Sequence, residues 1–326
     1  MSRYEFQSVF KEYIPDYISL RKASKSGPTV AIDRHYLEMF DNYLYTVQAG
    51  QDMVTEGLFH SWIQSLPFSR RTAACAVSSV RMFMKYLRGC GLDVFIPDIP
   101  KFTESYIPYL FSGDDIQQIF RLADSGAFAG RNRFLKAEFP MLLRLLLGCG
   151  LRIGETLSMK AGDIDFEKGV IIMKHTKRDR QRFVPMHPEL TGILERYCIA
   201  MEIIGIPDAW VFPGMDNSRR LRECNVDVWF RKMADIAGLP VPTVKGQRGP
   251  CLHCFRHLFV ANSFKNLTSA GLCADDVFPY LSTYLGHESL AETEKYMKFP
   301  SEMFQDELDR FGEYTSGLFP EVDYEE

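Results

Sequence analysis

The sequence predicts a mainly α-helical protein with a small antiparallel β-sheet, divided into two domains. Apolar residues recur at helical spacing through the first hundred residues. A stretch with three prolines and no clear period follows, and proline removes backbone donors and restricts its neighbour. Beyond it, two short β-like runs interrupt an otherwise helical pattern. At 326 residues the chain is long enough for two ordinary domains.

The first predicted domain, residues 1–98, is helical. Segments 32–47 and 56–66 have helical patterns, and one more helix is expected before them. A further helix carries an apolar stripe and, about 100° round its axis, a basic stripe. The apolar stripe consists of Val77, Val80, Met84 and Leu87, and the basic stripe of Arg81, Lys85 and Arg88. One face of that helix can enter a core while the other meets phosphates.

The proline-rich stretch FIPDIPKFTESYIPYLF predicts an extended linker at residues 99–111, and the second domain covers residues 112–300. Two helices open it, GDDIQQIF and AEFPMLLRLLL, and the latter stops at a Gly-Cys-Gly break. A short helix is expected from Arg152, followed by strands at 170–173 and 183–186 on either side of a polar, basic turn. An acidic tail helix is expected over residues 301–326.

Near the C-terminus, the sequence LGHESLAETEKYMKF places a histidine nine residues before a tyrosine. Ser289, followed three residues later by Glu292, is a capping-box pattern. A helix is therefore expected to begin near Leu290 and to carry Tyr296 in its second turn. His287 precedes this helix in a Gly-His turn. On these residues alone, a packed tyrosine and a surface histidine remain an open interpretation.

Composition narrows the class of protein. Hydrophobic content of 46% and charged content of 25% are typical of a soluble globular protein. The N-terminus has no apolar signal core, and the most apolar run, FPMLLRLLLGCGL, is too short for a bilayer and contains Arg144. Eight cysteines without a framework spacing suit reduced thiols. We therefore expect a cytoplasmic protein with no membrane partner.

The charge distribution points to a polyanionic partner despite a net charge of −4. Residues 301–326 hold nine acidic side chains and one basic, which leaves 37 basic and 33 acidic residues in the first 300. Basic residues also cluster between positions 69 and 92 and between positions 174 and 182. These clusters predict a nucleic-acid surface. The DNA-binding residues expected there are Arg70, Arg71, Arg81, Lys85, Arg88, Arg178 and Arg180.

Three further features can carry chemistry, and each has a structural alternative. Arg152 follows a glycine break, but could simply pair with Glu155 on its own helix. Lys177 lies in the basic turn, where it could be one of several solvated lysines. In CLHCFRH, His253 and Arg256 lie three apart and share one face if the segment is helical. His253 could equally be a satisfied core histidine.

A metal site is another interpretation of CLHCFRH. His253 and His257 have the spacing of a zinc-protease helix, but that motif has a glutamate where Cys254 stands. Cys251 and Cys254 have no matching second pair nearby. The sequence therefore predicts no metal and no cofactor.

Taken together and in order, these residues resemble the tyrosine recombinase family of phage integrases and Xer-type recombinases. The likeness covers most of residues 110–300. It rests on GLRIGE with Arg152, TKRDRQRFVP with Lys177, HCFRH with His253 and Arg256, and LGH with His287, nine residues before Tyr296. Lys177 has basic neighbours, so its identity depends on its distance from Val184-Pro185. The first domain looks like the family's helical core-binding domain, and the second like its mixed α/β catalytic domain.

The resemblance implies a covalent mechanism. Tyr296 would attack a DNA phosphate that is held in line and neutralised. Arg152 and Arg256 would donate forked hydrogen bonds to its non-bridging oxygens. Lys177 would protonate the 5′-oxygen leaving group.

Three more roles follow from the same resemblance. His253 would accept the tyrosine proton or support the phosphate, and His287 would donate a hydrogen bond to a non-bridging oxygen. Glu155, one turn beyond the first arginine, would orient this cluster.

The implied function is that of a site-specific DNA recombinase which cleaves and rejoins strands through a 3′-phosphotyrosyl intermediate. It would serve integration, excision or transposition of a mobile element, or multimer resolution. The partners would be double-stranded DNA with specific recombination sites and further copies of the chain, monomeric when free and tetrameric in the synapse. The alternatives are a type IB topoisomerase and a catalytically silent DNA-binding accessory protein. The tail would dock on a neighbouring protomer, pack on its own domain, or shield the basic clusters.

Overall fold

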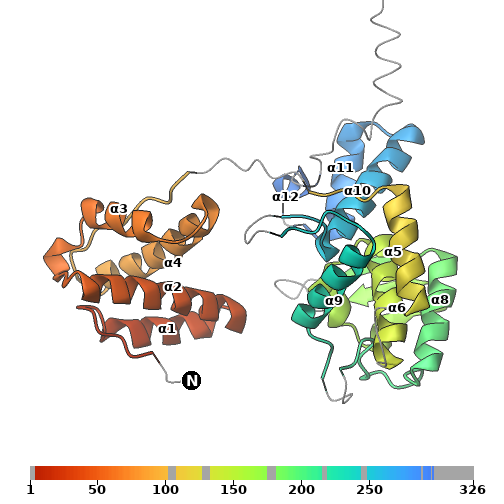
Figure 1. The fold of residues 1–326 in the computed structure, drawn as a ribbon, viewed down its shortest axis with the longest axis horizontal. Coiled ribbons are helices and arrows are strands. Elements are labelled where there is room, and N and C mark those ends of the chain that lie inside the picture. The colour runs from red at the N-terminus through yellow and green to blue at the C-terminus, as the bar shows by residue number, and fades with distance from the viewer. Residues whose placement is uncertain are drawn as a thin grey trace, which may run out of the picture. The chain divides into compact units, whose positions relative to one another are not determined.

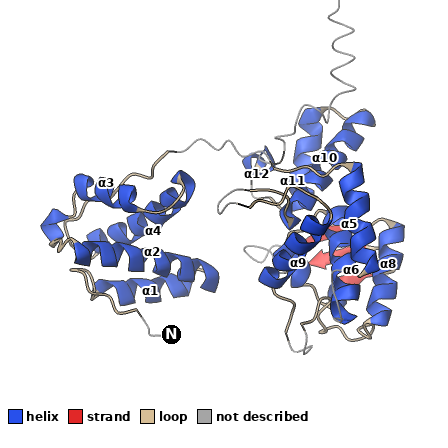
Figure 2. Cartoon of the chain, in the orientation of Figure 1, coloured by secondary structure: helices blue, strands red, loops and turns tan. Residues whose placement is uncertain are grey.

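The computed structural model describes residues 4–101, 108–126, 133–174, 181–214, 219–243, 248–287, 289–294 and 296. The chain divides into two compact units, Met1–Ser105 and Tyr106–Glu326 (Figure 1). Most of the described chain is helical, and the strands form one small sheet (Figure 2). The predicted fold class, mainly helical with a small antiparallel sheet, is confirmed.

The described part of the first unit, residues 4–101, contains four α-helices and a short 3₁₀-helix. They are α1 (Tyr13–Ser24), α2 (Gly27–Thr46), η1 (Gln51–Met53), α3 (Glu56–Ser65) and α4 (Arg70–Gly89). The predicted apolar stripe of α4 is fully buried, with Val77, Val80, Met84 and Leu87 at 0% exposure. Phe40 and Phe59 stack at the centre of this core, with ring centroids 5.1 Å apart. Burial of one helical face thus follows from its apolar spacing.

The basic stripe of α4 lies partly against its own chain. Arg81 Nη1 donates to the carbonyl of Pro97 and pairs with Asp98, and Arg88 Nη2 donates to the carbonyl of Val94 at 2.7 Å. The partner carboxylate, on Asp98, is fully exposed, so water screens that pair. Arg70, Arg71 and Lys85 are exposed.

The second unit wraps several helices around a three-stranded sheet and one central helix. Its elements before the sheet are α5 (Gly113–Ser125), α6 (Arg133–Cys149), α7 (Ile153–Leu157) and η3 (Ala161–Asp163). The strands are β1 (Ile164–Asp165), β2 (Val170–Met173) and β3 (Arg182–Pro185). The elements after the sheet are α8 (Pro188–Ala200), α9 (Glu223–Ile236), α10 (Leu252–Ser269), α11 (Ala274–Leu285) and α12 (Leu290–Glu294).

The sheet has the order β1-β2-β3, and all pairs are antiparallel. Ile171 on β2 lies opposite Val184 on β3, and both are fully buried, whereas Phe183, which precedes Val184 on β3, is 66% exposed. This alternation follows from the two-residue period of a strand. The strand β1 was not predicted, because two residues are too few for a sequence pattern.

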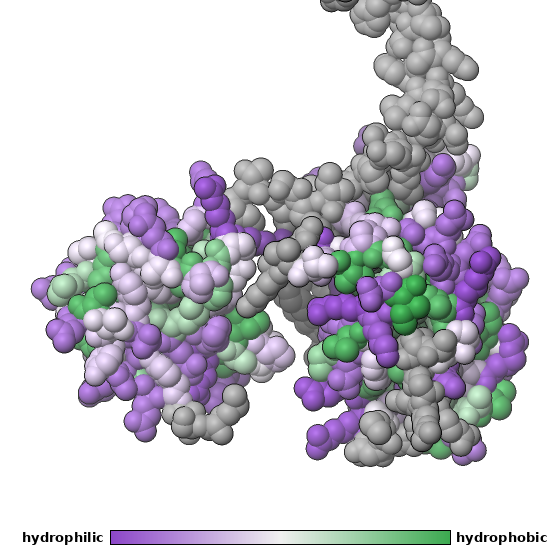
Figure 3. Space-filling view, in the orientation of Figure 1, coloured by the Kyte–Doolittle hydropathy of each residue, from purple (hydrophilic) through white to green (hydrophobic). Residues whose placement is uncertain are grey.

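The helix α6 forms the middle of the second core. Its residues Leu142, Leu143 and Leu145 have 0% exposure, and α5, α8 and α10 all pack against it. The helix α11 packs against α10 in turn. None of the described helices is long and apolar enough to cross a membrane. On the face in Figure 3, hydrophilic and hydrophobic side chains are interspersed over the described parts of each unit.

One detail differs from the sequence prediction. The helix α12 begins at Leu290 as expected but ends at Glu294, so Tyr296 lies beyond it rather than in a second turn. The predicted tail helix, residues 301–326, lies outside the described residues.

A glycine break after α6 brings the chain close to α10. Gly150 has φ +59°, a left-handed conformation that side chains other than glycine rarely adopt. A Cβ at this position would lie 2.7 Å from Cγ of the Phe259 ring. Backbone conformation and close packing therefore both require glycine here.

We expect Gly150→Ala to destabilise the protein more than Gly238→Ala. Gly238 has a similar φ of +69° but nothing within 4 Å of an added Cβ. Both variants incur the left-handed cost of about 1–2 kcal/mol, and the clash with Phe259 adds about 1–3 kcal/mol at Gly150. Urea denaturation of the two variants measures the difference, and equal losses would contradict the packing argument.

Candidate active site

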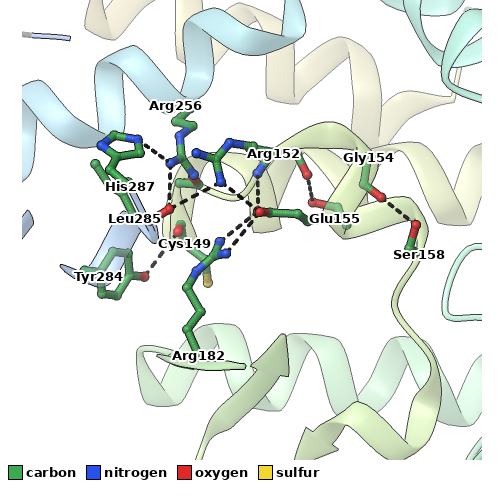
Figure 4. A network of polar contacts seen from close by, with 12 residues as sticks. Cys149, Arg152, Gly154, Glu155, Ser158, Arg182, Arg256, Tyr284, Leu285 and His287 are labelled. Atoms are coloured by element: carbon green, nitrogen blue, oxygen red, sulfur yellow. Dashed lines mark hydrogen bonds and ion pairs between the residues drawn. The ribbon is translucent and has the colours of Figure 1, made fainter. Parts of the chain in front are cut away.

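Polar side chains from four separate elements meet where α6 and α11 end. Arg152 stands immediately before α7, and Arg256 lies in the second turn of α10. His287 follows the end of α11, and Arg182 begins β3. Figure 4 shows these side chains pointing toward one another around Glu155 and the carbonyl of Leu285. We call this group the polar cluster.

Arg256 is the most deeply buried cation of the polar cluster, at 1% exposure. Its Nη1 donates to the carbonyl of Gly150 at 2.6 Å, and its Nη2 donates to the carbonyl of Leu285 at 3.0 Å (Figure 4). Both carbonyls lie at helix C-termini, which carry partial negative charge. Burial lowers the pKa of Arg256 to about 10, so the guanidinium remains charged at neutral pH.

The end of α11 fixes one of these carbonyls. Gly286 adopts φ +65°, and its N–H donates to the carbonyl of Thr283 while the N–H of His287 donates to that of Ser282. This pair of bonds is a Schellman motif, which ends a helix and leaves the carbonyl of Leu285 free for side chains. Arg152 Nη1 also approaches that carbonyl, at 3.4 Å.

Glu155 connects two arginines of the polar cluster. It accepts from Arg152 Nη1 at 2.9 Å and from Arg182 at 3.0 and 2.7 Å through both carboxylate oxygens. Burial alone would raise the pKa of Glu155, but the hydrogen bonds and charge of Arg182, followed by those of Arg152, lower it to about 2. The carboxylate is therefore ionised at neutral pH and holds both guanidinium groups in place.

The protonation of His287 follows from its neighbours. Its Nε2 lies 3.0 Å from Arg256 Nη2, and its Nδ1 lies 2.8 Å from Thr293 Oγ1. Because arginine cannot accept, Nε2 must be the acceptor. Burial, together with Arg256 and Arg152, lowers the pKa of His287 to about 4, which keeps the ring neutral. Because Nε2 already accepts from Arg256, it can donate to a phosphate oxygen only if the ring gains a proton or if Nε2 changes its hydrogen-bond partner.

Tyr296 lies among three imidazole rings. Its ring centroid is 5.2 Å from that of His287, 4.5 Å from that of His257 and 5.6 Å from that of His253. The Tyr296 hydroxyl lies 3.2 Å from His253 Nε2. Burial, with Arg256 and Arg152, lowers the pKa of His253 to about 4. A neutral imidazole at this distance can accept the phenol proton.

The arrangement combines a nucleophile, a proton acceptor and two oriented cations. The Arg256 guanidinium carbon lies 5.5 Å from the centre of the Tyr296 ring. The Arg152 side chain is 35% exposed, so a ligand can reach it. Hydrogen bonds of Arg256 go to carbonyls and an imidazole, and its Nε has no partner within the described residues. Guanidinium groups in general donate forked hydrogen bonds to tetrahedral oxyanions.

The structure brings together most of the residues that the sequence singled out. Arg152, Glu155, His253, Arg256, His287 and Tyr296 lie in or beside the polar cluster. Lys177, Arg178 and Arg180 lie outside the described residues. Lys174, the neighbouring lysine, pairs with Asp163 at 2.7 Å.

Two residues of the site were missed by sequence reasoning. The sequence places Arg182 at the end of a basic cluster that predicts a nucleic-acid surface, yet its side chain is 10% exposed and bound to Glu155. His257 was considered only as a metal ligand, and it packs against Tyr296 instead. Within the described part of the chain, no three His, Cys, Asp or Glu side chains are grouped so as to hold a metal ion.

Comparison with known proteins identifies similar chains. Residues 110–302 match the family described as "Phage integrase family". A putative integrase/recombinase, y4rB of Sinorhizobium fredii (strain NBRC 101917 / NGR234), is 26% identical over 93% of this chain and 97% of its own.

Two solved structures are similar in fold. XerH site-specific recombinase bound to palindromic difH substrate, in a post-cleavage complex, has a TM-score of 0.68 at 15% identity, over 87% of this chain and 80% of its own. The Tn1549 transposon integrase in complex with transposon right end DNA has a TM-score of 0.62 at 16% identity, over 94% of this chain and all of its own.

We expect Arg182→Met to destabilise the protein by about 3–5 kcal/mol at pH 7, because it leaves a buried carboxylate with one partner fewer. The matched control is Arg144→Met, which removes a partly exposed pair with Asp124 and should cost less than about 1 kcal/mol. Denaturant unfolding measures both, and similar losses would contradict the role of Arg182.

The pH dependence of the free energy of unfolding gives a second test of the pair between Arg182 and Glu155. The folded pKa of Glu155, about 2, lies below the unfolded value, about 4.3. Its stabilisation is therefore present above the unfolded pKa and is lost as pH falls toward 2. Arg182→Met should reduce that acid-dependent loss, whereas Arg144→Met should leave it unchanged.

Proposed function

The chain belongs to the phage integrase family, whose members cleave and rejoin DNA strands, and on this premise we propose that it is a site-specific recombinase of a mobile element or of replicon multimers. Integration, excision, transposition and multimer resolution share one strand-exchange chemistry. The observation that carries the proposal is the contact of Tyr296 with His253 and Arg256, together with the shared carbonyl of Leu285 that Arg152 and Arg256 both approach.

In the proposed reaction, Tyr296 attacks the phosphorus of a DNA strand. His253 Nε2, 3.2 Å from the hydroxyl, accepts the phenol proton. The strand breaks at its bond to the 5′-oxygen, and a 3′-phosphotyrosyl bond forms. This covalent bond retains the energy of the broken one, so a 5′-hydroxyl can later rejoin the strand without ATP.

Two arginines neutralise the phosphate in this proposal. Arg256 is fixed by carbonyls at two helix ends, and Arg152 is fixed by Glu155. Such prearranged donors stabilise charge that develops on the non-bridging oxygens in the transition state. Because the arginines supply the positive charge, the proposed chemistry requires no metal or other cofactor. Lys177 protonates the leaving 5′-oxygen, and His287 assists at a non-bridging oxygen.

The helical first unit is the proposed core-binding domain, with the second unit as the catalytic domain. Exposed Arg70, Arg71 and Lys85 support this assignment, since phosphate contacts need accessible cations. Arg81 and Arg88 donate to nearby backbone carbonyls, and their guanidinium groups still contribute positive charge to this surface. The proposed partners are double-stranded DNA with specific recombination sites and further copies of the chain, assembled as a tetramer in the synapse.

The acidic tail has a proposed role in assembly. Phe304, Leu308 and Phe311 recur at helical spacing and would dock on the neighbouring protomer. Packing on its own domain and shielding of basic clusters remain the alternatives for this segment.

We expect Tyr296→Phe to abolish the covalent DNA adduct while folding and DNA binding persist, because the change removes one oxygen and little volume. The matched control is Tyr284→Phe. The Tyr284 hydroxyl donates to the carbonyl of Cys149 at 3.1 Å and is thereby engaged with the backbone, so its loss should leave adduct formation intact. Denaturing electrophoresis of labelled DNA detects the adduct. An adduct that survives in Tyr296→Phe would refute the assignment.

We expect Lys177→Ala to slow cleavage of a normal strand by at least about 10²-fold. A strand with a 5′-thiol leaving group needs little protonation and should be cleaved at nearly the normal rate. The control, Lys174→Ala, removes a lysine that is paired with Asp163 and should not discriminate between the substrates. Equal losses on both substrates in Lys177→Ala would count against the general acid.

A supercoiled plasmid with two target sites tests the whole function, since relaxation of the plasmid without exchange of strands would indicate a topoisomerase.

A further inference from the structure

Two cysteines lie on either side of His253 at the start of α10. Cys251 precedes the helix in an extended conformation and is exposed, whereas Cys254 is fully buried. Their sulfur atoms are 3.5 Å apart. A disulfide bond is about 2.05 Å long, so the sulfurs must approach by roughly 1.5 Å. No other pair among the eight cysteines is in sulfur–sulfur contact in the described part of the chain.

The two thiols differ in reactivity. A hydrogen bond from the Cys254 thiol lowers the pKa of Cys251, and the amides of Cys254 and His253 act in the same direction against burial. The same hydrogen bond, together with burial, raises the pKa of Cys254. An exposed sulfur with thiolate character beside a buried thiol is the arrangement of an attacking and a resolving cysteine.

We propose that Cys251 and Cys254 form a redox-sensitive modification site, at which a low-molecular-weight disulfide reversibly converts the two thiols to a disulfide and thereby slows DNA cleavage. The thiolate of Cys251 attacks one sulfur of the small disulfide, and the other sulfur leaves as a thiolate. The Cys254 thiol loses its proton and attacks Cys251 Sγ, which releases the second small thiolate. The protein loses two electrons and two protons, and one small disulfide becomes two thiols.

The effect on cleavage follows from the position of His253 and rests on the proposed function. His253 lies between the two cysteines, and its Nε2 is 3.2 Å from the Tyr296 hydroxyl, near the upper limit for a hydrogen bond. Drawing Cys251 toward Cys254 moves the first turn of α10 and therefore the imidazole. A displacement of roughly 1 Å between reacting groups costs up to about 10²-fold in rate.

The test begins with the covalent state, which does not depend on any activity. The full chain is incubated with glutathione disulfide, its remaining thiols are alkylated, and peptides are analysed by mass spectrometry. A peptide that carries an intramolecular bond between Cys251 and Cys254, reversed by dithiothreitol, is the expected result. Cys251→Ser should prevent it, whereas Cys224→Ser, at another exposed cysteine, should not. A stable mixed disulfide on Cys251, or bonds at other cysteines only, would overturn the proposal.

Cleavage of a suicide DNA substrate is then measured before and after oxidation. We expect a fall of roughly 10- to 100-fold in the wild type and in Cys224→Ser, full recovery with dithiothreitol, and no change in Cys251→Ser. A disulfide that forms without slowing cleavage would refute the regulatory part. If the reduced wild type forms no adduct with DNA, the proposed function fails. The mass-spectrometric result still decides whether the thiol pair is a modification site.

Discussion

The buried guanidinium of Arg256 is the constraint on which the site depends. A cation at 1% exposure is costly to bury, and here it is stabilised by backbone carbonyls at the ends of two helices. For these carbonyls to converge, α6 must end just before Gly150 and α11 just before Gly286. The packing of α10 between them then places His253 and Tyr296 at hydrogen-bonding distance. Helix termination, core packing and proposed chemistry are thus linked through one side chain.

Glu155 extends this arrangement to the sheet. By accepting from both Arg152 and Arg182, it joins the start of α7 to the first residue of β3. In the sequence, Arg182 comes five residues after Lys177, the proposed general acid. The Glu155 carboxylate therefore holds both Arg152, which is proposed to bind phosphate, and the first residue of the strand that follows Lys177 in the chain.

Much of this site could be predicted from the sequence, and the misses have physical causes. Local patterns sufficed for the apolar stripe of α4 and for β2, because a face buried along one element leaves a period in the sequence. The burial of Arg182 left no such trace, since it depends on Glu155, 27 positions away. The contact of His257 with Tyr296 depends likewise on how α10 meets the segment after α12. Residues that act through tertiary contacts are recognised only when those contacts are known.

Because backbone carbonyls hold Arg256, the substitutions that can be tolerated around it differ from those at an ion pair between two side chains. A carboxylate partner disappears with a single codon change, but a carbonyl is retained whichever side chain its residue carries. Leu285 can therefore vary in side chain, within the limits of its packing, without removing the acceptor. The vulnerable positions are instead the two glycines, whose backbone conformation other residues rarely adopt. Substitution of these glycines is therefore expected to disturb Arg256 more than a change in the side chain of Leu285.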